Sequence, residues 1–89
     1  MVSKEQIQKD FKGELKLYRD EYQRDGYFSD SEPFCFTDEI MDGYHRDLVD
    51  KRFHSKNGEY DEEHDGKYLH YFKIAEQLLE ELELELEGV

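Results

Sequence analysis

Apolar side chains recur at helical spacing in three separate stretches of this 89-residue chain, and this periodicity limits the folds that it can adopt. In residues 3–25, successive apolar residues are four, four, three and four positions apart. Such intervals place the side chains on one face of a helix. We therefore expect a first helix over residues 3–25, with Ser3 capping its start and Gly26 just beyond its end. Its apolar face consists of Ile7, Phe11, Leu15, Tyr18 and Tyr22.

The second periodic stretch covers residues 37–54. Thr37 is a favourable N-cap, and Asp38 and Glu39 would complement the helix dipole in the first turn. We expect a second helix over residues 37–54, preceded by an aromatic loop over residues 26–37 that folds back over the core. The apolar face of this helix consists of Ile40, Met41, Tyr44 and Leu48, with Phe53 as a further candidate.

The third stretch, residues 67–87, predicts a long amphipathic helix that follows a polar, acidic loop over residues 57–66. A helix of this length spans about 31 Å. Residues 82–87 read LELELE, and strict alternation also fits a strand, so both states stay open for these positions. A short strand around residues 34–36 is compatible with the sequence as well. The buried face of the third helix would consist of Tyr68, Tyr71, Phe72, Ala75, Leu78, Leu79, Leu82 and Leu86.

These elements predict a mostly α fold, namely a compact three-helix domain over residues 1–89 with a long C-terminal amphipathic helix and room for a minor, short strand pair. Aromatic residues make up 15% of the chain, too many for a disordered acidic tail even though 40% of the residues are charged. Tyr and Phe bury a large area per side chain, so a core can form from few aliphatic residues. We expect Cys35, which lies between Phe34 and Phe36, to be buried with them.

Charge is distributed unevenly along the chain, whose net charge is −12. Residues 1–26 hold six bases and six acids, residues 27–60 hold four bases and eight acids, and residues 61–89 hold two bases and ten acids. A surface this acidic repels nucleic acid and anionic membranes, and it attracts basic protein surfaces. The C-terminal third is therefore where we expect a partner to bind.

Glutamates of the third helix repeat at spacings of four, three and four from Glu76 to Glu87 and would line one helical face. The carboxylates between these two positions would lie along about 16.5 Å of helix axis, or one per roughly 3 Å. A DNA strand carries one phosphate per roughly 3.4 Å, so the charge densities match. The competing interpretation is a solvated face without a binding role. The candidate partner-binding residues are Glu76, Glu80, Glu81, Glu83, Glu85, Glu87, Asp61, Glu62, Glu63, Asp65 and Tyr60.

Two acidic patterns suggest metal chemistry, and each lacks an essential part. Asp61, Glu63 and Asp65 match the first ligand positions of an EF-hand loop. The position that needs a bidentate glutamate is then Phe72, and the four histidines show no zinc-binding spacing.

The pairs Glu39/Asp42 and Glu62/Asp65 have the ExxD spacing that all-α nucleotide pyrophosphohydrolases use to hold magnesium. The second pair falls in the expected acidic loop, where such enzymes have a helix. We expect no catalytic residue, no metal site and no cofactor, and a magnesium-dependent pyrophosphohydrolase stays a minor alternative.

A cytoplasmic location is expected from two features. Cys35 is the single cysteine, so no intramolecular disulfide can form. The chain also shows neither an apolar run of signal-peptide length near its start nor a stretch of membrane-spanning length.

In size, acidity and aromatic content the chain resembles small acidic proteins that phages and mobile elements encode against host nucleic-acid-binding machinery. That group includes DNA mimics that block restriction enzymes and anti-CRISPR proteins that occupy the DNA channel of a nuclease. The resemblance implies a binding and inhibitory protein, without enzyme activity, that blocks a basic surface in the host cytoplasm and contacts neither nucleic acid nor membrane. The alternative is an antitoxin-like or scaffolding protein, such as a homodimer, that pairs helices through Leu84 and Leu86.

Overall fold

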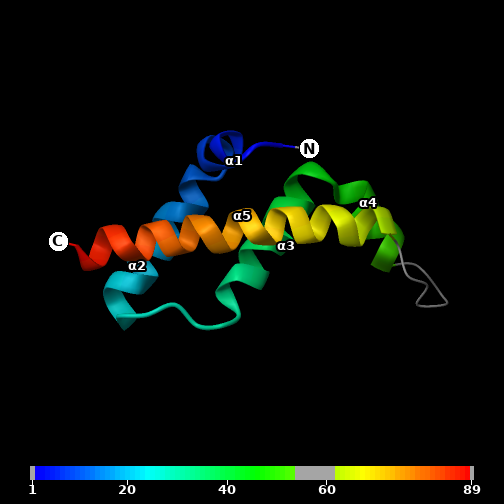
Figure 1. Cartoon of the computed structure of the whole chain (residues 1–89). Helices are drawn as coiled ribbons and strands as arrows, with labels where there is room; N and C mark the ends of the chain where they lie inside the picture. The colour runs from blue at the N-terminus through cyan, green and yellow to red at the C-terminus, as the bar shows by residue number, and fades with distance from the viewer. Residues whose placement is uncertain (1, 54–61, 89) are drawn as a thin grey trace.

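The computed structural model describes residues 2–53 and 62–88, and all regular elements within these ranges are α-helices (Figure 1). They are α1 (Lys4–Asp10), α2 (Lys12–Asp25), α3 (Glu32–Tyr44), α4 (Arg46–Phe53) and α5 (Glu62–Glu87). The mostly α fold with a long C-terminal helix is thus confirmed. No strand occurs in the described residues, and positions 82–87 are helical.

Helix α5 runs along the long dimension of a molecule that measures 48 × 24 × 18 Å (Figure 1). Its 26 residues correspond to about 39 Å of helix. Helices α2 and α3 cross α5 in opposite directions and are joined by residues 26–31, while α4 follows α3 near the start of α5 (Figure 1). The other helices therefore pack around one long element.

The first predicted helix is interrupted at Phe11, which ends α1 and precedes α2 with φ −109° and ψ 28°. The break directs the Phe11 ring toward α3, where it contacts Tyr44 edge-on at 5.4 Å between ring centroids. Gly43 gives this ring its space, since a Cβ at Gly43 would lie 2.9 Å from Phe11 Cζ. The capping role of Ser3 is confirmed, because its Oγ accepts from the Gln6 amide at 3.3 Å.

The predicted start of the second helix at Thr37 is wrong, because α3 already begins at Glu32. Pro33 lies in the first turn, where a missing amide hydrogen costs nothing. Thr37 is buried inside the helix, and its hydroxyl donates to the Pro33 carbonyl at 2.6 Å instead of capping. The predicted range 37–54 is also divided at His45, which separates α3 from α4.

The start predicted for the third helix is five residues late, since α5 begins at Glu62 instead of Lys67. Its first turn holds Glu62, Glu63 and Asp65, and acids there are stabilised by the helix dipole. This favourable interaction with the helix dipole offsets the loss of helix stability, about 1 kcal/mol, that a glycine such as Gly66 causes inside a helix. All of the expected acidic loop that the structure describes, residues 62–66, is therefore helical.

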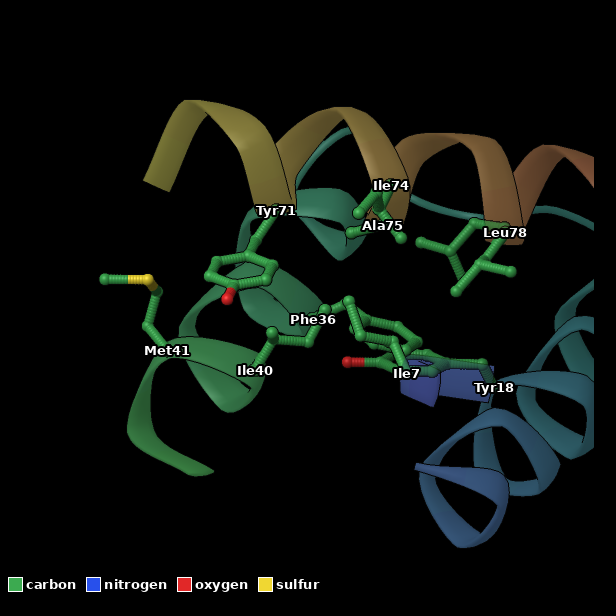
Figure 2. Close-up of a cluster of buried hydrophobic side chains, with 10 residues drawn as sticks. Ile7, Tyr18, Phe36, Ile40, Met41, Tyr71, Ile74, Ala75 and Leu78 are labelled. Atoms are coloured by element: carbon green, nitrogen blue, oxygen red, sulfur yellow. The ribbon is translucent and has the colours of Figure 1, made fainter. Parts of the chain in front are cut away.

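One hydrophobic cluster connects α1, α2, α3 and α5 (Figure 2). Its centre is aromatic, with the rings of Tyr18 and Phe36 stacked at 5.3 Å and Tyr71 fully buried beside α3. Large rings fill the space between α2 and α3, so few aliphatic residues are needed. The cluster consists of Ile7, Tyr18, Phe36, Ile40, Met41, Tyr71, Ile74, Ala75, Leu78 and Leu79.

The aromatic loop preceding the second predicted helix covers the core only in part. Phe36 is buried and Phe28 packs against Tyr22, but Tyr27 and Phe34 are exposed. Cys35 is also exposed, so its predicted burial is wrong. The reason is the early start of α3, because one helical face cannot bury residues 34, 35 and 36 together.

Candidate partner-binding surface

The glutamates in the C-terminal half of α5 form two groups that differ in their surroundings. Helical periodicity turns Glu81 and Glu85 toward α1 and α2, whereas Glu76 and Glu80 project from the other edge into solvent. The face predicted from the sequence as one surface is therefore divided.

The first group forms ion pairs within the molecule. Lys4 Nζ pairs with Glu81, and Arg19 Nη2 lies 2.7 Å from Glu85 Oε1. These bonds join α1 and α2 to α5. Both pairs are partly solvated, so each contributes about 0–1 kcal/mol to stability. We name Glu81 and Glu85 the paired edge.

Glu87 and Glu83 lie beside Tyr22 near the end of α5. The Tyr22 hydroxyl donates to Glu87 Oε1 at 2.9 Å. This hydrogen bond, partial burial and the charges of Glu87 and Glu83 raise the pKa of Tyr22. Tyr22 therefore stays a neutral donor and fixes the tip of α5 against α2.

The second group has no counter-ion in the part of the chain that the structure describes. Glu76, Glu80 and Glu83 make no ion pair with any residue in 2–53 or 62–88. Leu84 lies one turn after Glu80 and is 62% exposed. We name the set Glu76, Glu80, Glu83, Leu84 and Glu87 the α5 ridge, in which Glu83 is half-buried and Glu87 also accepts from Tyr22.

The acids at the start of α5 are separate from the α5 ridge. Glu63 lies 3.5 Å from Lys67 Nζ, and Asp65 Oδ1 lies 3.1 Å from Nδ1 of the buried His64. The helical rise between Glu63 and Glu76 is about 20 Å, so the two sets do not form one patch. Two further predicted contact residues, Tyr60 and Asp61, lie outside the described residues.

The acidic pairs with ExxD spacing both lie on helices, which corrects the loop assignment of the second pair. Glu39 of the first pair accepts from the Tyr18 hydroxyl of α2 at 3.3 Å, and Asp65 of the second pair contacts His64. Partial burial raises the pKa of Glu39. Among the described residues, no three His, Cys, Asp or Glu side chains gather in a way that could hold a metal ion.

Sequence reasoning missed an aromatic pair at the start of α3. The rings of Phe34 and Phe72 lie 4.8 Å apart, and Phe34 remains 51% exposed. The sequence signal was the run Phe34-Cys35-Phe36, in which helical geometry turns one phenylalanine inward and the other outward.

A second missed feature is a buried hydrogen-bond chain around Tyr71. The Tyr71 hydroxyl accepts from the Val2 amide at 3.2 Å and lies 2.8 Å from His45 Nε2. Burial and the nearby charge of Lys67 lower the pKa of His45, so its neutral form is favoured. These hydrogen bonds connect the segment before α1 to the α3–α4 junction.

Comparison with known proteins gives no relative, because no protein family, curated protein or solved structure matches this chain. Over residues 2–53 and 62–88, none of the helices has the length and apolar character needed to cross a bilayer.

Proposed function

We propose that this protein is a small acidic binding protein that inhibits a basic nucleic-acid-binding protein, such as a nuclease, by occupying its nucleic-acid groove with the α5 ridge. The observation that carries the proposal is the division of the α5 glutamates. Cations of α1 and α2 neutralise Glu81 and Glu85, but none neutralises Glu76 or Glu80 in the described residues. Uncompensated charge on one rigid helix steers a basic partner toward that helix.

Geometry adds two supporting features. The four carboxylates of the α5 ridge form a row of like charge along about 16.5 Å of one helix, roughly 5.5 Å apart on average, which is sparser than the roughly 3.4 Å spacing of phosphates in a DNA strand. Leu84 supplies an exposed apolar side chain among these carboxylates, and a buried apolar anchor is what gives charged interfaces their lifetime. The proposal includes a phage or mobile-element origin, an anti-CRISPR or anti-restriction role and action in the host cytoplasm.

The test begins with affinity capture from a bacterial lysate at low and high salt. A basic nucleic-acid-binding protein identified by mass spectrometry is then purified, and its DNA binding is followed by fluorescence anisotropy while this protein is added. We expect displacement of the DNA, with a potency that falls as salt rises.

Charge reversal identifies the surface. Glu76→Lys/Glu80→Lys/Glu83→Lys should weaken inhibition by about 100-fold or more, because attraction becomes repulsion at three contacts. The control Glu5→Lys/Asp30→Lys/Asp42→Lys changes the net charge equally at exposed positions away from α5. Equal loss in both variants would show that only total charge matters and would refute the α5 ridge as the site.

A second candidate function rests on Leu84. Its exposure favours a scaffolding or antitoxin-like role in which α5 pairs with a helix of another protein. Leu86, the other leucine predicted for such pairing, is half-buried. Under this alternative, Leu84→Lys abolishes partner binding while Glu76→Lys/Glu80→Lys leaves it intact.

A further inference from the structure

A cavity of about 750 Å³ opens beside α2, on a part of the molecule that the proposed function does not use. Leu15 of α2 and Leu82 of α5 give it an apolar floor. Lys12, Lys16 and Arg19 contribute cationic side chains, and Asp20 is the one acid in its lining. The cavity is therefore a locally basic, apolar site on a protein whose net charge is −12. We name it the α2 pocket.

Two of the three cations of the α2 pocket are available to a ligand. Lys12 and Lys16 are exposed and make no ion pair with the residues that the structure describes. Arg19 already pairs with Glu85 through Nη2, and its Nε, which has no acceptor within the described ranges, is buried. An apolar floor bordered by free ammonium groups matches an amphipathic segment that carries carboxylates.

We propose that the α2 pocket binds the α5 ridge of a second copy of this chain. The residues that line the pocket along α2 include Lys12, Lys16, Arg19 and Gln23, which lie at relative positions 0, 4, 7 and 11. The carboxylates of the α5 ridge, Glu76, Glu80, Glu83 and Glu87, lie at the same relative positions. On two helices packed side by side, equal spacing brings each acid opposite a polar or cationic side chain over about 16.5 Å.

The intervals of four, three and four residues are the same in either direction, so the match between the two helices holds for parallel and antiparallel packing. Leu84, which lies beside Glu80 and Glu87 on the helix surface, is placed to fill the apolar floor formed by Leu15 and Leu82. Burial of an exposed leucine adds a hydrophobic term to the charge pairing. The contact joins different surfaces of the two copies, so it forms a two-fold dimer, a ring or a chain.

Net charge opposes this association and sets the conditions for observing it. Two copies that each carry a charge of −12 repel at long range, while the contact pairs attract. At about 0.15 M salt the Debye length is about 8 Å, so the distant repulsion is screened more than the ion pairs in contact. Association is therefore expected at physiological salt and is weaker at very low salt.

The inference does not depend on a foreign partner, and its test uses this protein alone. Light scattering after size exclusion measures the mass of the wild type at about 200 µM, a concentration that populates weak complexes. The monomer mass is 10.8 kDa. We expect a mass of at least twice this value. A pocket variant, Lys12→Glu/Lys16→Glu, and a ridge variant, Glu80→Ala/Leu84→Ala, should each be monomeric.

Mixing the two variants is the decisive step. The pocket variant keeps an intact α5 ridge, and the ridge variant keeps an intact α2 pocket, so an equimolar mixture should form a dimer that grows no further. The control Lys9→Glu/Arg46→Glu carries the same charge as the pocket variant, with both changes at exposed positions outside the α2 pocket, and should associate like the wild type. Circular dichroism establishes that each variant retains its helical content.

Three results would overturn the inference: a monomeric wild type, a pocket variant that associates like the wild type, or a folded mixture that stays monomeric. Because foreign partners are absent from this experiment, its failure leaves the proposed inhibition of a basic protein standing. If both hold, self-association and partner binding compete for the α5 ridge.

Discussion

In the C-terminal half of α5, glutamates on one edge face cations of α1 and α2, whereas glutamates on the other edge face solvent. Glu81 and Glu85 belong to the first group, and Glu76 and Glu80 belong to the second. The residue type and the helix are the same, so the difference comes only from which elements pack alongside. A count of acidic residues therefore overstates the binding surface, because part of the charge is used to hold the molecule together.

The largest effect on stability is expected at Ile7, the side chain through which α1 packs into the core. Ile7 is fully buried, and Ile7→Ala should lower the free energy of unfolding by about 2–5 kcal/mol through lost burial and a residual cavity. Glu80→Ala, at a solvated position, should change it by less than about 0.5 kcal/mol. Urea unfolding followed by circular dichroism measures both. Equal losses of unfolding free energy in the two variants would contradict the contrast between the buried Ile7 and the solvated Glu80 of the α5 ridge.

A smaller effect is expected at the contact that accompanies the break between α1 and α2. Gly43→Ala places a methyl group against the Phe11 ring and should cost about 1–3 kcal/mol. Gly13→Ala is the matched control, because nothing lies within 4 Å of the added methyl group. The control should raise stability by up to about 1 kcal/mol through its helix propensity. The melting temperatures of the two variants should therefore move in opposite directions.

The paired edge itself can be tested by a double-mutant cycle. Replacing Arg19 and Glu85 by alanine, singly and together, should give a coupling energy of about 0.2–1 kcal/mol, typical of partly solvated ion pairs. The same cycle on Lys16 and Glu80, for which the structure shows no ion pair, should give a value near zero in the monomer. A coupling at Lys16 and Glu80 that persists at high dilution would place the α5 ridge within the internal network.

The smallest effect concerns Glu39, a carboxyl that, within the described residues, accepts a hydrogen bond from Tyr18 instead of joining an ion pair like Glu85. Partial burial raises its pKa in the folded state, so the charged form is disfavoured by folding. Glu39→Gln should therefore stabilise the protein at pH 7, by up to about 0.5 kcal/mol because solvent screens the site. The gain should disappear as the pH falls below the folded-state pKa of Glu39, where the wild-type carboxyl is also protonated. Melting curves at pH 7 and pH 4 measure the difference, and a gain that grows toward pH 4 would contradict this assignment.

Periodicity predicted the helical character of the fold and the residues of the core. The stripes that predicted three helices contain most of the buried residues, from Ile7 to Leu79. The boundaries failed where tertiary contacts decided them. Phe11 interrupts the first predicted helix and packs against Tyr44 of α3. Thr37 lies inside α3, where its hydroxyl donates to the Pro33 carbonyl.

The candidate site was predictable in composition but not in its division. The spacing from Glu76 to Glu87 correctly placed these carboxylates on a helix. Which of them meet Lys4 or Arg19 depends on how α1 and α2 fold against α5, and intervals within one segment carry no such information. For the same reason the α2 pocket was missed, because Leu82 completes it from the far end of the chain.

The division of α5 is tested most directly by two double neutralisations on this helix, Glu76→Gln/Glu80→Gln on the α5 ridge and Glu81→Gln/Glu85→Gln on the paired edge. Each removes two charges, so total charge is matched. Binding to the captured basic partner and the free energy of unfolding are measured for both variants. The first variant should weaken binding by about tenfold or more at unchanged stability. The second should lose up to about 2 kcal/mol of stability and keep its affinity. Loss of affinity in the second variant equal to that in the first would contradict the division of α5 into a structural edge and a binding ridge.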